Sequence, residues 1–220
     1  MSESISTKTV RVWDPFVRIF HWTLVAGFAV AYLTEGEPFW LHITAGFIVA
    51  GLVAARILWG FVGPEYARFS NFIYKPSDVL SYLKGSFTGT SKRYLGHSPA
   101  GGAMVIALLL SLAGTTGTGA YMYFTGSPEG QESGEAKDSS GVSPFAVSQG
   151  EEQGEASESG ERDEAGGTGE RAENPLEEVH EFFANFTLLL VMLHIAGVAL
   201  ASFTHRENLP RAMVTGTKRK

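Results

Sequence analysis

Long apolar runs alternate with polar segments along the chain. Four runs are long enough to cross a bilayer as helices, which takes about 20 residues. They are residues 16–33, 39–62, 99–124 and 182–203. The pattern predicts an all-α integral membrane protein, a bundle of four transmembrane helices. The first three helices and the N-terminal tail make up residues 1–124, and the fourth helix with a basic tail makes up residues 176–220.

Lys and Arg are distributed unevenly between the connections. They are frequent before the first span, between the second and third spans, and in the tail, whereas residues 34–38 contain no basic residue. The side rich in Lys and Arg is normally cytoplasmic, so both termini are expected in the cytoplasm. The polar start leads directly into a full-length span without a cleavage motif, and the first span is therefore interpreted as a retained helix.

A polar insert, residues 125–175, separates the third and fourth spans. It is rich in Gly, Ser and Glu and contains few large apolar residues. Such a segment buries too little apolar surface to offset its ordering entropy, so it is predicted to be a disordered outer (periplasmic) loop. It is either a solvated linker or an acidic surface that attracts a basic partner. The insert also explains a net charge of −6 in a chain whose inner connections are basic.

The chain has no cysteine. This excludes covalently attached c-type haem, thiolate-bound iron–sulfur clusters and disulfides. Any redox centre must therefore be held by histidine, methionine or carboxylate.

Four of the six histidines lie in or beside the spans at matching depths. His180 and His194 are 14 residues apart, which on a helix is roughly 21 Å along the axis and within about 40° of one face. Because successive spans run in opposite directions, His42 shares the outer depth with His180, and His21 shares the inner depth with His194. The pattern predicts two non-covalent b-type haems with bis-histidine ligation, one near each membrane surface.

Other metals and other histidines fit the pattern less well. Zinc is the main rival metal, but its sites usually add acidic or cysteine ligands at close spacing, which these spans lack. His205 lies nearly on the stripe of His194, yet His194 is preferred because it is inside an apolar run. His97 opens the third span and is interpreted as a helix-start residue. The third span contains no histidine and is expected to serve as a packing wall.

Basic residues at the inner depth are candidates for binding haem propionates. Arg56 lies 14 residues after His42, and so on nearly the same stripe. Arg56 and Arg68 are the predicted partners, with Arg18 as a third candidate; the alternative is that they reach lipid phosphates. Gly46 and Gly197 would let a porphyrin approach its helix, although such glycines also suit helix packing.

Several blocks resemble one family. Residues 12–22 read VWDPFVRIFHW, which is similar to the opening of the bacterial diheme cytochrome b-561 family, including the b-type cytochrome subunit of nickel–iron hydrogenases. Residues 56–63 (RILWGFVG), 67–69 (ARF) and 94–99 (YLGHSP) are similar too. The acidic insert is longer than this family leads one to expect. The resemblance implies a quinone-reactive cytochrome of the bacterial inner membrane, with His21, His42, His180 and His194 as metal ligands of two haems b.

Three functions remain open. The first is an electron-transfer subunit between the quinone pool and an outer redox protein, either a c-type cytochrome or a hydrogenase or dehydrogenase subunit. The second is a stand-alone quinone oxidoreductase for a small outer donor such as superoxide, which an acidic outer face would repel. The third is a haem-free four-helix scaffold or transporter, for which the spans offer no acidic pathway. No nucleic-acid partner and no catalytic residue are expected.

A quinone site needs an ionisable group beside it, because quinone chemistry moves protons together with electrons. The sequence offers candidates at both surfaces and does not choose between them. At the inner surface they are Tyr94, His97 and His205, and at the outer surface Glu177, Glu178 and Glu181.

Overall fold

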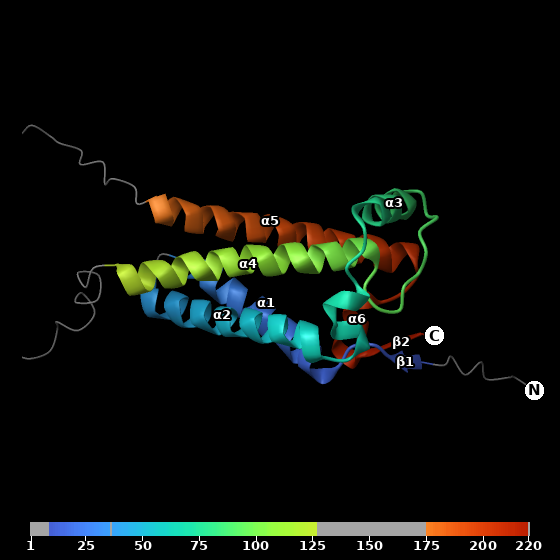
Figure 1. The fold of residues 1–220 in the computed structure, drawn as a ribbon, viewed down its shortest axis with the longest axis horizontal. Coiled ribbons are helices and arrows are strands. Elements are labelled where there is room, and N and C mark those ends of the chain that lie inside the picture. The colour runs from blue at the N-terminus through green and yellow to red at the C-terminus, as the bar shows by residue number, and fades with distance from the viewer. Residues whose placement is uncertain (1–8, 36, 127–174, 220) are drawn as a thin grey trace, which may run out of the picture.

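Each of the four apolar runs forms one long helix in the computed structural model, which describes residues 9–35, 37–126 and 175–219 (Figure 1). The helices are α1 (Pro15–Leu33), α2 (Phe39–Val62), α4 (Pro99–Thr125) and α5 (Pro175–Thr204). All four are long and apolar enough to cross a membrane. The predicted four-helix membrane bundle is thus confirmed, while the prediction of a disordered insert concerns residues that lie almost entirely outside the described ones.

The starts of these helices follow from local chemistry. Asp14 caps α1 by accepting a hydrogen bond from the Val17 N–H at 3.1 Å, and Ser98 caps α4 by accepting one from the Gly101 N–H at 3.2 Å. A proline follows each cap at the position where its missing N–H costs nothing. Helix α5 begins seven residues before the predicted fourth span, which places His180 inside the helix.

Helix α4 is central in the bundle. It packs against α2 on one side and α5 on the other, and α1 packs against α2. The buried core between α1, α2 and α4 is apolar and consists of Phe20, Val49, Val53, Leu109 and Leu112.

A buried pair of hydroxyl groups links α4 to α5. The Oγ of Ser111 and the Oγ1 of Thr187 are 2.7 Å apart, and both side chains are inaccessible to solvent. Small polar residues of this kind let two helices in a membrane approach and hydrogen-bond each other. This contact adds a polar link to the apolar packing between α4 and α5.

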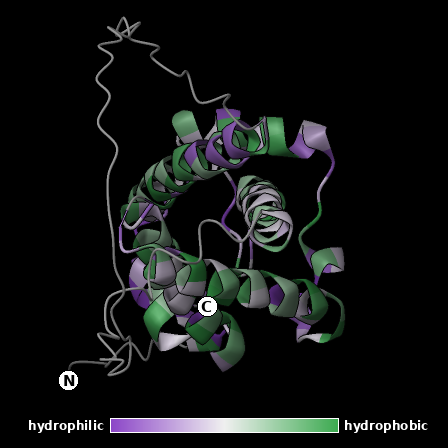
Figure 2. Cartoon of the chain, turned by 90° about the vertical axis from the view of Figure 1, so that its left-hand side faces the viewer, coloured by the Kyte–Doolittle hydropathy of each residue, from purple (hydrophilic) through white to green (hydrophobic). Residues whose placement is uncertain are grey.

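The long helices consist largely of hydrophobic residues (Figure 2), many of which lie on their outward faces. Exposed apolar residues on these faces include Ile19, Trp40, Leu58, Leu110 and Phe203. A water-soluble protein rarely exposes so much contiguous apolar surface, whereas lipid covers such faces without cost.

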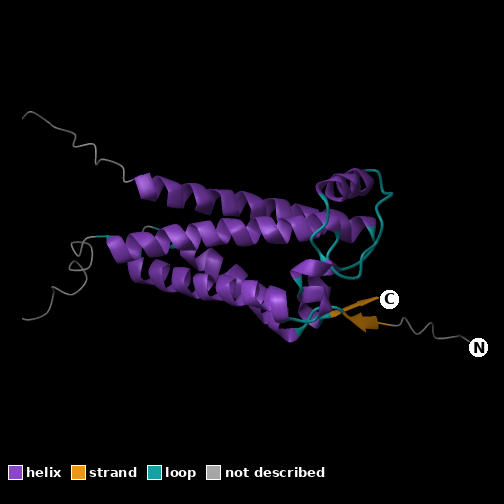
Figure 3. Ribbon diagram, in the orientation of Figure 1, coloured by secondary structure: helices purple, strands orange, loops and turns teal. Residues whose placement is uncertain are grey.

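One end of the bundle, which we call the terminal end, carries smaller elements that the sequence analysis did not predict (Figure 3). They are two 3₁₀ turns (Glu65–Ala67 and Phe69–Asn71), α3 (Pro76–Phe87), α6 (Leu209–Thr215), and the strands β1 (Thr9–Arg11) and β2 (Thr217–Arg219). The two strands pair antiparallel, with Val10 opposite Lys218. The opposite end, where α4 finishes and α5 begins, is called the insert end.

Candidate functional site

The first histidine pair lies toward the insert end and joins α2 to α5. The ring centroids of His42 and His180 are 6.2 Å apart, with the ring planes at 72°. The Nδ1 of His42 is 2.8 Å from the carbonyl oxygen of Ala31, and the Nδ1 of His180 is 3.0 Å from the carbonyl oxygen of Thr115. A carbonyl only accepts hydrogen bonds, so both Nδ1 atoms carry the proton. Each Nε2 is then left with a free lone pair for a metal.

The second pair lies toward the terminal end and joins α1 to α5. The ring centroids of His21 and His194 are 6.4 Å apart, with the ring planes at 55°. The Nδ1 of His21 is buried and has no hydrogen-bond partner among the described residues. Both rings are half-buried. The structure therefore brings together the two pairs that depth along the spans predicted.

The separations fit two imidazoles that share one metal ion. A metal–imidazole bond is roughly 2 Å long and the ring centre lies about 1 Å beyond the nitrogen, so opposed rings have centroids about 6 Å apart. Among the described residues, no group of three or more His, Cys, Asp or Glu side chains gathers at one point. Two opposed imidazoles are the protein ligands that a haem iron takes when its porphyrin supplies the other four.

Helix α4 contributes more than the packing wall that the sequence analysis assigned to it. The Oγ1 of Thr118 is 3.1 Å from the Nδ1 of His180, beside the Thr115 carbonyl. Its hydroxyl donates to the Gly114 carbonyl at 2.8 Å, so its oxygen accepts from the imidazole. A Cβ at Gly119 would lie 2.9 Å from the Cε1 of His180. The small polar run at residues 114–119 was the signal for this role.

Space remains beside the other ligand helices. A Cβ built at Gly46 or Gly197 meets no atom within 4 Å, and α5 makes no extended backbone contact with α1 or α2. The glycines that follow His42 and His194 therefore lie away from neighbouring helices, which leaves room for a flat cofactor or for lipid.

The predicted propionate partners occupy different settings. Arg56 is 3 % exposed, donates one hydrogen bond to the Ala67 carbonyl at 3.2 Å, and leaves its Nη1 buried without a partner. Arg68 is exposed and donates from Nε to the Gly63 carbonyl at 2.7 Å. Arg18 donates to the Val214 carbonyl, while its own Nε is buried without a partner.

His97 packs between two aromatic rings, one from the N-terminal segment and one from the connection between α2 and α3. Its ring centroid lies 4.8 Å from that of Trp13 and 4.5 Å from that of Phe72, and its Nδ1 is buried without a partner. Burial, followed by the positive charges of Arg56 and Lys218, lowers the pKa of His97 from 6.5 to about 3. His97 is therefore neutral at physiological pH.

Pockets occur at both ends of the bundle. At the terminal end, a pocket of about 330 Å³ is lined by His97 and three tyrosines, Tyr66, Tyr74 and Tyr94. Burial, and then Tyr94, raises the pKa of Tyr74. At the insert end, a more open hollow of about 470 Å³ is lined by α5 residues alone, including Glu178 and Glu181.

His205 lies apart from both pairs. Its Nε2 is 3.5 Å from the hydroxyl oxygens of Tyr82 and Ser91, between the end of α5 and the segment around α3. His194, and not His205, faces His21.

Fold and site together define a helical membrane protein of the b-type cytochrome class. A family model described as prokaryotic cytochrome b561 matches residues 12–216. The match spans nearly the whole chain, so the chain belongs to the prokaryotic cytochrome b561 family, and the resemblance seen in the sequence is confirmed. No curated protein and no solved structure matches the chain. The protein is a bacterial membrane cytochrome of a family that binds haem b and functions in electron transfer.

Proposed function

We propose that the chain binds two haems b and transfers electrons between the quinone pool and a redox partner. One haem is held by His42 and His180, and the other by His21 and His194. The observation that carries this proposal is the pair of ring separations, 6.2 and 6.4 Å, in a chain of the b561 family. Bound haem b supplies a one-electron ferric/ferrous couple, while the chain sets its position, ligation and burial.

Arg56 and Arg68 are the proposed partners of the propionates. Arg56 has the stronger support, because a buried guanidinium nitrogen without a partner needs an acceptor. The Nε of Arg68 donates to the Gly63 carbonyl. Its two terminal nitrogens can still bind a carboxylate at the surface.

The quinone is assigned to the pocket at the terminal end. Tyr94 and His97 line it, and a neutral imidazole or a phenol can exchange a proton with a quinone head group. The hollow at the insert end is lined by one helix only and is more open to its surroundings. Photoaffinity labelling with an azidoquinone should mark Tyr94 and its neighbours; labelling of α5 near Glu181 would instead place the site at the insert end.

The proposed setting is the bacterial inner membrane, with the terminal end toward the cytoplasm and the redox partner outside. The partner is a c-type cytochrome or a hydrogenase-type subunit. In proteoliposomes, quinol-dependent reduction of an added c-type cytochrome would support a subunit role, whereas superoxide-dependent reduction of quinone by the chain alone would favour the stand-alone alternative. Phosphatase and fluorescent-protein fusions at the C-terminus test the orientation.

The ligand assignment is tested by haem content and spectra of single variants purified in detergent. Wild type should contain two haems b per chain, and His42→Ala, His180→Ala, His21→Ala and His194→Ala about one each. The two variants of one pair should show the same spectrum, which is that of the haem held by the other pair. Variants of different pairs should show different spectra. His205→Ala is the matched control and should keep both haems.

Two results would count against the assignment. A folded wild-type chain that takes up no haem when haem is supplied would overturn the cytochrome proposal for this chain. If His205→Ala loses a haem while His194→Ala keeps two, the ligand is His205 and not His194.

A further inference from the structure

Helix α3 carries an exposed apolar stripe. Leu80, Leu83 and Phe87 are 56 %, 39 % and 78 % exposed. They are spaced by three and four residues, so they lie on one face of the helix. Ser77 and Ser81 are also exposed but lie on a different side of the helix. The exposed surface of α3 is therefore amphipathic, and its apolar side needs a cover other than water.

A separate face fixes α3 to the bundle. Ser86 is buried, Val79 and Tyr82 are half-buried, and α3 packs against α4 and α5 through this side. The hydroxyl oxygen of Tyr82 lies 3.5 Å from the Nε2 of His205, directly after the end of α5 (Figure 1). The bundle thus occupies a face of α3 other than the apolar stripe.

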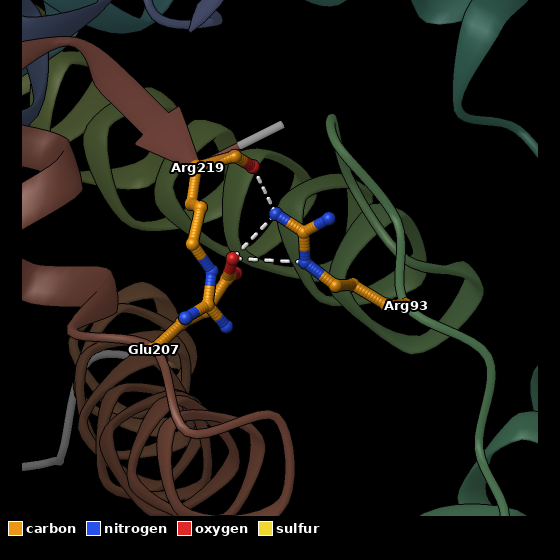
Figure 4. A network of polar contacts seen from close by, with 3 residues as sticks. All are labelled: Arg93, Glu207 and Arg219. Atoms are coloured by element: carbon orange, nitrogen blue, oxygen red, sulfur yellow. Dashed lines mark hydrogen bonds and ion pairs between the residues drawn. The ribbon is translucent and has the colours of Figure 1, made fainter. Parts of the chain in front are cut away.

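The chain on either side of α3 is also anchored. Before the helix, the Tyr74 hydroxyl donates to the carbonyl of His97 at 3.3 Å. After it, Arg93 donates to the carboxylate of Glu207 at 2.8 and 2.5 Å and to the carbonyl of Arg219 (Figure 4). The direction in which the stripe faces is therefore set by the fold.

Helix α3 lies at the level where the apolar spans end. Tyr82 is beside His205, and the last turn of α5 before His205 still exposes Phe203 at 87 %. Lipid that covers Phe203 therefore reaches the depth of α3. A helix at this depth, with an apolar stripe and a polar side, is typical of segments that lie in the membrane–water interface.

Lysines border the stripe and give this segment a positive charge. Lys84 lies in α3, Lys75 and Lys92 flank the helix, and all three are exposed. With Asp78 as the one acidic residue, residues 75–92 have a net charge of +2. No ion pair among the described residues involves any of these lysines. A basic border around an apolar stripe is complementary to the anionic phosphates that lie next to the hydrocarbon of a bilayer.

We propose that α3 is an interfacial helix that binds anionic phospholipid. Leu80, Leu83 and Phe87 enter the edge of the hydrocarbon, and Lys84 binds a lipid phosphate beside them. The inference goes beyond the proposed function, because it involves neither histidine pair and requires neither haem nor quinone. It gives the connection between α2 and α4 a task of its own, which is to hold the terminal end at the membrane surface.

The first test measures the depth of the stripe. Because the chain contains no cysteine, a single introduced cysteine is a unique site for a spin label. The full chain is reconstituted in vesicles of phosphatidylcholine and phosphatidylglycerol, with Leu80→Cys and Phe87→Cys on the stripe and Ser77→Cys and Ser81→Cys as matched controls. Labels on the stripe should be relaxed more by oxygen, which concentrates in hydrocarbon, than by a water-soluble nickel chelate. The controls should show the opposite order.

Two results of this test would overturn the inference. If the nickel chelate relaxes all four labels more than oxygen does, the stripe faces water. If both reagents fail to reach the labels at residues 80 and 87, a second copy of the chain covers the stripe.

The second test measures the lipid preference. Bimane attached to Phe87→Cys should be quenched more by nitroxide-labelled phosphatidylglycerol than by phosphatidylcholine with the same label. Lys84→Gln should weaken the association with phosphatidylglycerol about fivefold. Arg211→Gln is the matched control, because it removes one charge from an exposed position on α6, and it should leave the preference unchanged.

Equal quenching by the two lipids, or an equal loss in Lys84→Gln and Arg211→Gln, would overturn the assignment of a lipid phosphate to Lys84. A folded chain that takes up no haem would count against the proposed function and would change none of these readings.

Discussion

The two histidine pairs differ in what holds their rings. At His42–His180, backbone carbonyls of α1 and α4 and the hydroxyl of Thr118 fix each Nδ1. At His21–His194, the Nδ1 of His21 has no partner among the described residues. We infer that hydrogen bonds raise the basicity of the ligands in the first pair, whereas His21 lacks this support. The two haems are therefore expected to titrate at different potentials.

The largest expected effect comes from a steric clash at the His42–His180 pair, whose rings are held by hydrogen bonds. Gly119→Val would place a side chain where the Cε1 of His180 lies, 2.9 Å from a Cβ at this position. The ring must move, and haem content should fall from two to about one per chain. Gly117→Val is the matched control, because a Cβ there meets nothing within 4 Å. Pyridine-haemochrome assays measure both, and two haems in Gly119→Val would contradict the proposed position of His180.

Removing one orienting hydrogen bond should have a smaller effect on the same pair. Thr118→Val keeps the shape of the side chain but removes the oxygen that accepts from the Nδ1 of His180. Loss of such a contact typically weakens metal binding about tenfold or more, and here the Thr115 carbonyl remains. The haem at His42–His180 should be released to apomyoglobin about tenfold faster. Thr116→Val, whose hydroxyl bonds only to its own helix, should leave the rate unchanged.

The terminal end should respond to pH through His97. Its folded pKa of about 3 lies below the ordinary value of 6.5, so between these values the unfolded chain binds a proton that the folded chain excludes. The stabilisation is therefore fully present well above pH 6.5 and falls as the pH drops toward 3, by roughly 1 kcal/mol at pH 5.5.

Thermal unfolding in detergent at pH 7.5 and 5.5 measures this loss. The stability of His97→Gln should change less between the two pH values than that of the wild type. The stability of His205→Gln should change as much as that of the wild type. An unchanged slope in His97→Gln would contradict the buried, neutral state of His97.

The smallest expected effect concerns the link between α4 and α5. Ser111→Ala removes the 2.7 Å contact with Thr187, while Thr187 keeps a longer one to Thr115 at 3.4 Å. Hydrogen bonds between membrane helices contribute about 0.6 kcal/mol on average. Unfolding in mixed micelles should show a loss of this size, compared with none for Thr125→Ala at the exposed end of α4. A loss of several kcal/mol would mean that this contact, and not apolar packing, holds α5 in place.

The sequence was sufficient where a strong physical constraint acts on many residues. Burial in lipid requires long apolar helices, so all four spans were predicted, three of them to within one residue at each end. Depth then paired His42 with His180 and His21 with His194, because alternating direction fixes which residues share a level.

Short elements carried too little signal. Helix α6 has seven residues and each strand has three, so propensity could not identify them. The role of Thr118 depends on a contact with a residue 62 positions away, and the terminal sheet depends on the pairing of two distant strands. Neither is encoded in the period of a single helix. The start of α5 was placed too late because Glu177, Glu178 and Glu181 interrupt the apolar run without interrupting the helix.

The pairing of β1 with β2 has a consequence for biogenesis. Residues 9–11 leave the ribosome before all four spans, and residues 217–219 leave it after them. The spans therefore enter the membrane while β1 is still unpaired. Pairing of the two strands follows insertion of the spans, so a substitution that blocks this pairing should disturb the terminal end and leave insertion unchanged.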